Sequence, residues 1–145
     1  MKLRNIFLIA VILPLLSGCG TPKEDPNLDT DEEVIKVIKD NMNAYRNEDI
    51  KGILATMDKE SPSYIDIPPA LEPAFQNYDL EYRMEYIKVI SKSETMAKVL
   101  FVQATRKING PPFRNNRITG YHLLKKKTGE WKIARTDISA VKYLK

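Results

Sequence analysis

The sequence predicts an α+β fold in which N-terminal helices pack on a curved, antiparallel sheet of four strands. Two observations carry this prediction. Apolar residues recur at helical spacing as far as Met57, and they recur at every second position from Tyr78 onward. Helices and strands in separate runs are typical of the α+β class. A chain of 145 residues is long enough to bury one core of moderate size, so we expect a single domain over residues 34–145.

Two helices are expected first. Between residues 34 and 45, five apolar side chains recur on one helical face, and the acidic residues 31–33 lie where carboxylates favour the helix dipole. Asn47-Glu48-Asp49 supplies capping side chains for a second, short helix, despite Gly52. The apolar positions of the two helices are Val34, Ile35, Ile38, Met42, Tyr45, Ile50, Ile53, Leu54 and Met57.

Prolines dominate the next segment. We expect Ser61-Pro62 and Pro68-Pro69 to break the chain, because proline lacks the amide hydrogen that a helix interior needs. A short helical segment is expected over residues 70–76, before Asn77.

The first strand begins at Tyr78, where apolar and charged residues alternate. The apolar positions then shift by one residue, to Ile87 and Val89, so we expect a β-bulge near Tyr86 that bends the sheet. Residues 96–105 are apolar on both faces, as in a central strand.

Two further strands are expected, over residues 118–126 and 131–138. Asn109-Gly110 is a turn signal, and Pro111-Pro112 prevents ladder pairing directly after it. The last two strands are joined around Thr128-Gly129. The result is an antiparallel meander of four strands.

Two short motifs in this order of elements resemble the nuclear transport factor 2-like (SnoaL-like) superfamily. Residues 44–49 (Ala-Tyr-Arg-Asn-Glu-Asp), with Leu54 and Met57-Asp58, are similar to its first helical hairpin, and residues 127–133 (Lys-Thr-Gly-Glu-Trp-Lys-Ile) are similar to its last β-hairpin. The resemblance covers roughly residues 32–140. It implies a cone-shaped fold with a pocket in its mouth. The superfamily mixes isomerases, dehydratases, binding modules and accessory domains, so the resemblance assigns no chemistry.

The first eighteen residues have the organisation of an export signal. Lys2 and Arg4 precede an apolar run from Ile6 to Leu16, which is too short to span a bilayer. Leu16-Ser17-Gly18-Cys19 then resembles the lipobox of bacterial lipoproteins, in which cleavage before the cysteine accompanies attachment of a diacylglycerol to its sulfur. We therefore expect a signal peptide over residues 1–18 and a lipidated Cys19 on the extracytoplasmic face of the cell membrane.

Charge is distributed unevenly along the chain. Residues 20–33 contain one base and six acids, which predicts a solvated tether over residues 19–33. Residues 106–145 contain eleven bases and two acids, which indicates either a solvated hairpin rich in lysine or a surface for an anionic partner such as anionic lipid or a wall polymer. Nucleic acid is not expected outside the membrane.

The candidate site residues are polar groups on the predicted strands and first helix. His122, the sole histidine, is either a structural residue or a pocket group. Arg135 and Asp137 share one strand face, either as a pocket floor that recognises a polar ligand or as a surface ion pair. Tyr45, Tyr82 and Tyr86 either line the same pocket or pack in the core.

These observations predict a non-catalytic binding module for a small polar or anionic ligand or an envelope component. One alternative is an isomerase- or dehydratase-type enzyme that uses Asp137 with a tyrosine or His122. Another is a protein–protein interaction module, and a homodimer through the open sheet is expected from the superfamily. The sequence contains no pattern for a metal site, a phosphate loop or a bound cofactor, and we expect none.

Overall fold

The computed structural model describes residues 31–145. The predicted signal peptide, Cys19 and most of the acidic tether therefore lie outside the described residues. The acidic residues Asp31, Glu32 and Glu33, expected at the end of the tether, form the first turn of the first helix.

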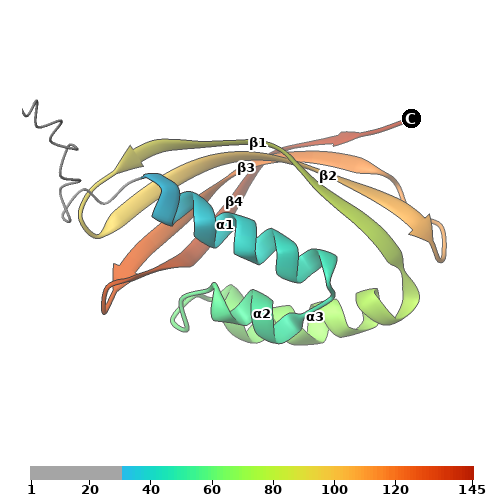
Figure 1. Cartoon of the computed structure of the whole chain (residues 1–145). Coiled ribbons are helices and arrows are strands. Elements are labelled where there is room, and N and C mark those ends of the chain that lie inside the picture. The colour runs from blue at the N-terminus through green and yellow to red at the C-terminus, as the bar shows by residue number, and fades with distance from the viewer. Residues whose placement is uncertain (1–30) are drawn as a thin grey trace, which may run out of the picture.

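Within residues 31–145, three helices precede four strands, and the α+β prediction is confirmed. The strands lie in the sheet in chain order and every neighbouring pair is antiparallel. The sheet arches over α1, and α2 and α3 lie on the side of α1 away from the sheet (Figure 1). The elements are α1 (Asp31–Arg46), α2 (Ile50–Ala55), α3 (Ser63–Asn77), β1 (Asp79–Lys92), β2 (Met96–Asn109), β3 (Asn116–Lys127) and β4 (Glu130–Tyr143).

The first two helices form where the apolar spacing predicts them. Asp49 caps α2, and its carboxylate accepts a hydrogen bond of 2.9 Å from the Gly52 amide. This bond satisfies one of the amide groups that the first turn of a helix leaves without a partner. Glu48 takes a φ of 54° in the tight connection between α1 and α2.

The predicted break at Pro68-Pro69 is wrong, because α3 runs continuously from Ser63 through both prolines and through Pro73. The φ that a proline ring imposes is compatible with a helix, although each proline removes one helical hydrogen bond. Tertiary packing compensates, because four side chains at helical spacing pack on the cluster formed by buried residues of the first two helices and the loop after them. The four side chains are Tyr64, Ile67, Leu71 and Phe75.

Bulges give the sheet its curvature. The register between β1 and β2 shifts between Met84 and Tyr86, which confirms the bulge expected near Tyr86. Two further shifts lie in the β3–β4 pair, where Ala134 and Ser139 are the additional residues on β4. Each such residue moves the following side chains of β4 to the opposite face.

The main core lies between the first half of α1 and the concave face of the sheet. All of its seven buried members have an exposed fraction of 4% or less. They are Val34, Ile38, Ala97, Val99, Leu124, Trp131 and Ile133. This cluster covers one end of the concave face, which leaves the other end for a cavity.

Candidate functional site

A cavity of about 430 Å³ lies between the concave face of the sheet, α1 and α3. Its side chains come from all four strands, and Ile67 and Leu71 of α3 contribute a wall. The deep end is formed by buried apolar residues, including Ile38, Phe101 and Ile133. The lining residues that are exposed to solvent are Ser63, Arg135, Thr136 and Ile138, which places the mouth between the start of α3 and the second half of β4.

His122 lies in the wall of this cavity, where it is 8% exposed. Its ring stacks on Phe101 with a centroid distance of 4.2 Å, and its Nδ1 lies 2.8 Å from the hydroxyl oxygen of Thr136. Desolvation by burial lowers the pKa of His122 to about 4. The imidazole is therefore neutral at physiological pH.

Tyr45 and Tyr82 both line the cavity, and their ring centroids are 5.6 Å apart. Desolvation raises the pKa of Tyr45, and desolvation together with the nearby Tyr45 and Glu48 raises the pKa of Tyr82 to about 12. Tyr86 follows the bulge, is 47% exposed and borders a different groove, beside α1, with Lys39 and Arg46. The structure thus brings two of the three predicted tyrosines to the cavity and places the third elsewhere.

Arg135 and Asp137 share one face of β4, as alternation predicts, and form an ion pair of 2.8 Å. The additional residue at Ala134 makes Thr136 the residue opposite His122, while Arg135 and Asp137 lie opposite Leu123 and Tyr121. Their side chains are 62% and 48% exposed. Arg135 borders the mouth of the cavity and Asp137 is absent from its lining within residues 31–145, so of the two interpretations the arrangement is that of a surface ion pair and not that of a pocket floor.

Several polar residues of the cavity were not predicted from sequence. Asn41 is 8% exposed and donates a hydrogen bond of 2.7 Å to the Thr56 hydroxyl. Its position between Ile38 and Met42, on the apolar side of α1, was a usable signal, because a polar residue on a buried helix face needs a partner. Ser61 is 5% exposed, lines the cavity, and its hydroxyl has no hydrogen-bond partner among the described residues. No sequence pattern marks Ser61.

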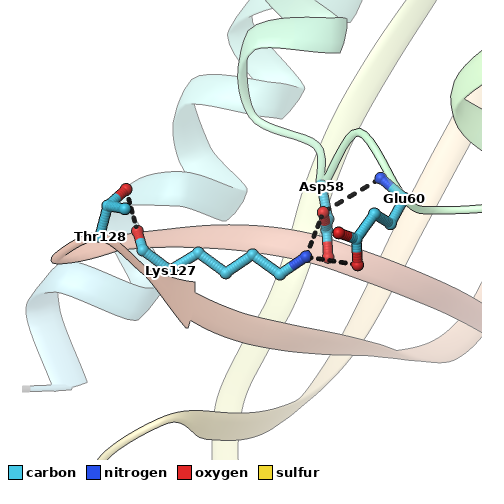
Figure 2. A network of polar contacts seen from close by, with 4 residues as sticks. All are labelled: Asp58, Glu60, Lys127 and Thr128. Carbon is cyan, nitrogen blue, oxygen red and sulfur yellow. Dashed lines mark hydrogen bonds and ion pairs between the residues drawn. The ribbon is translucent and has the colours of Figure 1, made fainter.

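A network of polar contacts among Asp58, Glu60 and Lys127, called the clip below, holds the segment between α2 and α3 against the last hairpin (Figure 2). Lys127 donates to Asp58 at 3.1 Å and to Glu60 at 2.7 Å, and the Asp58 amide donates to the Ile133 carbonyl at 2.8 Å. Burial of Asp58 raises its pKa, but the Glu60 amide and Lys127 stabilise the carboxylate more, so the pKa lies below its ordinary value. The clip positions Met57 and Ser61, which belong to the cavity wall.

Two classes of feature are absent from residues 31–145. No group of three or more histidine, cysteine or acidic side chains could hold a metal ion there. None of the three described helices has the length and apolar character needed to cross a bilayer.

Residues 36–144 match the family of the C-terminal domain of the anti-sigma-I factor RsgI9. The anti-sigma-I factor RsgI9 of Acetivibrio thermocellus is 42% identical to the chain over 106 residues. The match covers 72% of this chain and 15% of that protein, so the chain corresponds to a small part of its relative.

Solved structures share the fold at much lower identity. An NTF2-like protein of unknown function from Pseudomonas putida is 15% identical with a TM-score of 0.59, covering 75% of this chain and 84% of that one. A ketosteroid isomerase-like protein from Erwinia carotovora is 17% identical with a TM-score of 0.57, covering 75% and 95%. A protein of unknown function with a cystatin-like fold from Nostoc punctiforme is 10% identical with a TM-score of 0.61, covering 74% and 88%. These likenesses confirm the nuclear transport factor 2-like fold.

Proposed function

Because the chain belongs to the family of the C-terminal domain of anti-sigma-I factor RsgI9, we propose that it is a non-catalytic, ligand-binding domain held on the outer face of a bacterial membrane. The observation that carries the binding role is the cavity of about 430 Å³, whose mouth opens between α3 and β4. Its volume and its mostly apolar walls with a few polar groups are typical of small-molecule sites.

The positions of the titratable groups favour binding over acid–base catalysis. Asp137, the carboxylate that the enzymatic alternative would use, lies on the other face of β4 and pairs with Arg135. His122 has a pKa of about 4, far from the value near the working pH at which an acid or base is most effective. Its Nδ1 is also hydrogen-bonded to the Thr136 hydroxyl. These contacts suit a wall residue better than a proton carrier.

The relationship to an anti-sigma factor suggests that ligand recognition and action on a sigma factor belong to different parts of that protein. The chain matches 15% of RsgI9, so the part of that protein that acts on a sigma factor need not be the shared part. We propose that the shared domain contributes recognition of a ligand, in this chain as in its relative.

The proposed anchor rests on the residues before the domain. Cys19 ends a lipobox-like tetrapeptide, and two acyl chains at its sulfur would hold the protein stably at a membrane surface. Mass spectrometry of the native protein should find a chain that begins at Cys19 with a diacylglycerol mass. A Cys19→Ser variant should keep its leader and lose the lipid. An unmodified thiol, or a cytosolic product, would contradict the anchor.

Further partners belong to the same proposal. The basic residues of β2, β3 and β4 would favour anionic lipid or a wall polymer near the membrane, and the sheet face away from the helices is open to a second copy of the chain. Binding to vesicles with and without anionic lipid tests the first contact, and sedimentation of the protein at increasing concentration tests the second.

The cavity itself is tested by analysing small molecules released from the purified protein. Ile138 lies at the mouth and is 49% exposed, so Ile138→Trp should obstruct the entrance without disturbing the core. Val141 lies on the same strand, is 52% exposed and is outside the cavity lining, so Val141→Trp is the matched control. We expect a compound retained by the parent chain and the control to be lost from Ile138→Trp. Equal retention by both variants would remove the cavity as the binding site.

A further inference from the structure

The walls of the cavity restrict the kind of molecule that it can hold. Building on the binding function proposed above, we infer that the ligand is an uncharged, mostly apolar molecule with at least one hydroxyl or carbonyl group. This differs from the polar or anionic ligand that the sequence suggests, and the difference follows from which side chains the fold turns toward the cavity.

The apolar part of the cavity wall can adapt to the shape of a ligand. Met42, Met57 and Met84 come from α1, from the segment after α2 and from β1, and all three line the cavity. Methionine is unbranched and polarisable, so it fits irregular apolar shapes at little cost. Phe101 and Ile133, both 2% exposed, close the deep end behind them. An apolar body of the ligand would be buried against these side chains.

The described lining of the cavity offers a charged ligand group no side chain of opposite charge that is not already paired. Among the described residues that line the cavity, Arg135 carries the formal charge, and its Nε and Nη2 already lie 3.1 and 2.8 Å from Asp137. The cavity disfavours negative and positive charge alike, because desolvation raises the pKa of Tyr82 and lowers the pKa of His122. The first shift disfavours an anion and the second disfavours a cation. A charged ligand group placed there would lose its hydration without compensation.

Hydrogen-bonding groups are present nonetheless. The Ser61 hydroxyl is buried without a partner among the described residues, which leaves its hydrogen-bonding capacity unused. A buried hydroxyl in this state costs free energy, and a ligand hydroxyl or carbonyl could recover it once the Ser61 side chain changes rotamer and turns its oxygen toward the cavity. The phenols of Tyr45 and Tyr82 and the amide of Asn41 lie in the same lining. A neutral ligand with a polar group therefore matches this cavity better than a hydrocarbon does.

Four probes that share a biphenyl body isolate the effect of charge: biphenyl-4-methanol, biphenyl-4-carboxylate, biphenyl-4-methylammonium and 4-methylbiphenyl. The full chain is held in phospholipid nanodiscs, and the free probe is measured in the protein-free compartment of a dialysis cell. Binding is followed by the imidazole resonances of His122, which is the sole histidine and lies in the cavity wall. Signals from probe dissolved in lipid do not enter this readout.

We expect biphenyl-4-methanol to bind at least about 10-fold more tightly than either charged probe, and more tightly than 4-methylbiphenyl. Ile138→Trp should remove the shift of His122, and Val141→Trp should keep it. If the carboxylate or the ammonium binds as well as the alcohol, the inferred ligand class is wrong while the binding function stands. If no probe moves the His122 resonances, both the ligand class and the proposed binding function are contradicted.

Discussion

The two ends of the concave sheet face differ in how they are covered, although the same strands run through both. At the first end, α1 lies on the sheet, and Leu124 and Val99 are completely buried. At the second end, His122 and Thr136 face a cavity, and Ile138 is 49% exposed. His122 is two residues from Leu124 on β3. One strand thus contributes to the core and to the cavity wall within two residues.

This comparison shows where the domain can change without losing its fold. The closed end has tight apolar packing that resists substitution, whereas the open end already contains empty volume. Variation of the exposed residues at the mouth of the cavity should therefore cost little stability, whereas variation of the buried residues at its deep end should cost more. The predictions below test that difference between the two ends.

The largest difference is expected from truncation of one apolar residue at each end. Leu124→Ala removes a completely buried side chain and should lower the free energy of unfolding by about 2–5 kcal/mol, because a cavity remains in a packed region. Ile138→Ala, at the half-exposed mouth, should cost less than about 1 kcal/mol. Urea unfolding of both variants measures this. Equal losses would mean that the two ends are packed alike.

The buried histidine should make stability depend on pH. Because its pKa is about 4 in the folded protein and about 6.5 in an unfolded chain, the unfolded state takes up a proton first as the pH falls. Stability should therefore decrease from about pH 6.5 to about pH 4, by as much as about 3 kcal/mol, and the His122 contribution should level off below that. Unfolding at a series of pH values measures the slope. His122→Gln has no titrating side chain at this position, so its stability should not decrease in this way between about pH 6.5 and about pH 4. An unchanged slope in His122→Gln would contradict the role assigned to the histidine.

The clip between Asp58 and Lys127 should act at lower pH. The pKa of Asp58 is lowered on folding, so its contribution to stability is present above the unfolded value of 3.8 and is lost as the pH falls through the folded value. Asp58→Asn should lower the melting temperature at pH 7 and flatten its dependence on pH below 4. The matched control is Asp40→Asn, which breaks the exposed pair with Lys36 and should change neither. Similar effects of both variants would show that the contacts of Asp58 stabilise the fold no more than the exposed ion pair of Asp40 does.

The smallest effect is expected from Asp137→Asn. Asp137 lies half-exposed on the other face of β4, and surface ion pairs contribute little to stability. The variant should bind the alcohol probe with unchanged affinity and melt within a degree or two of the parent chain. A loss of binding above about 10-fold would place the carboxylate in the site after all.

Much of the fold could be predicted from local patterns. The helix at Ile38, the cap at Asp49 and the bulge near Tyr86 follow from spacing and residue type over a few positions. The continuous α3 could not be predicted in this way, because Pro68 and Pro69 oppose a helix locally. It forms because Ile67 and its neighbours at helical spacing pack on side chains that are distant in the sequence.

Some residues of the candidate site could likewise be predicted from local patterns, and others could not. Tyr45, Tyr82 and His122 could be chosen from sequence because apolar periodicity placed them on covered faces, and the structure finds all three in the cavity lining. Arg135 could not be placed, since one additional residue at Ala134 reverses the faces of the side chains from Arg135 to Ile138, and a second at Ser139 reverses them again.

The chain's local chemistry thus establishes its order of helices and strands, its turns and the apolar faces that must be covered, because each depends on residues a few positions apart. Which covered positions become core, which become cavity wall and which polar groups stay without a partner depends on strand register and on the packing of α1 and α3. Those contacts join segments as distant as Ser61 and Thr136, and no short-range pattern records them.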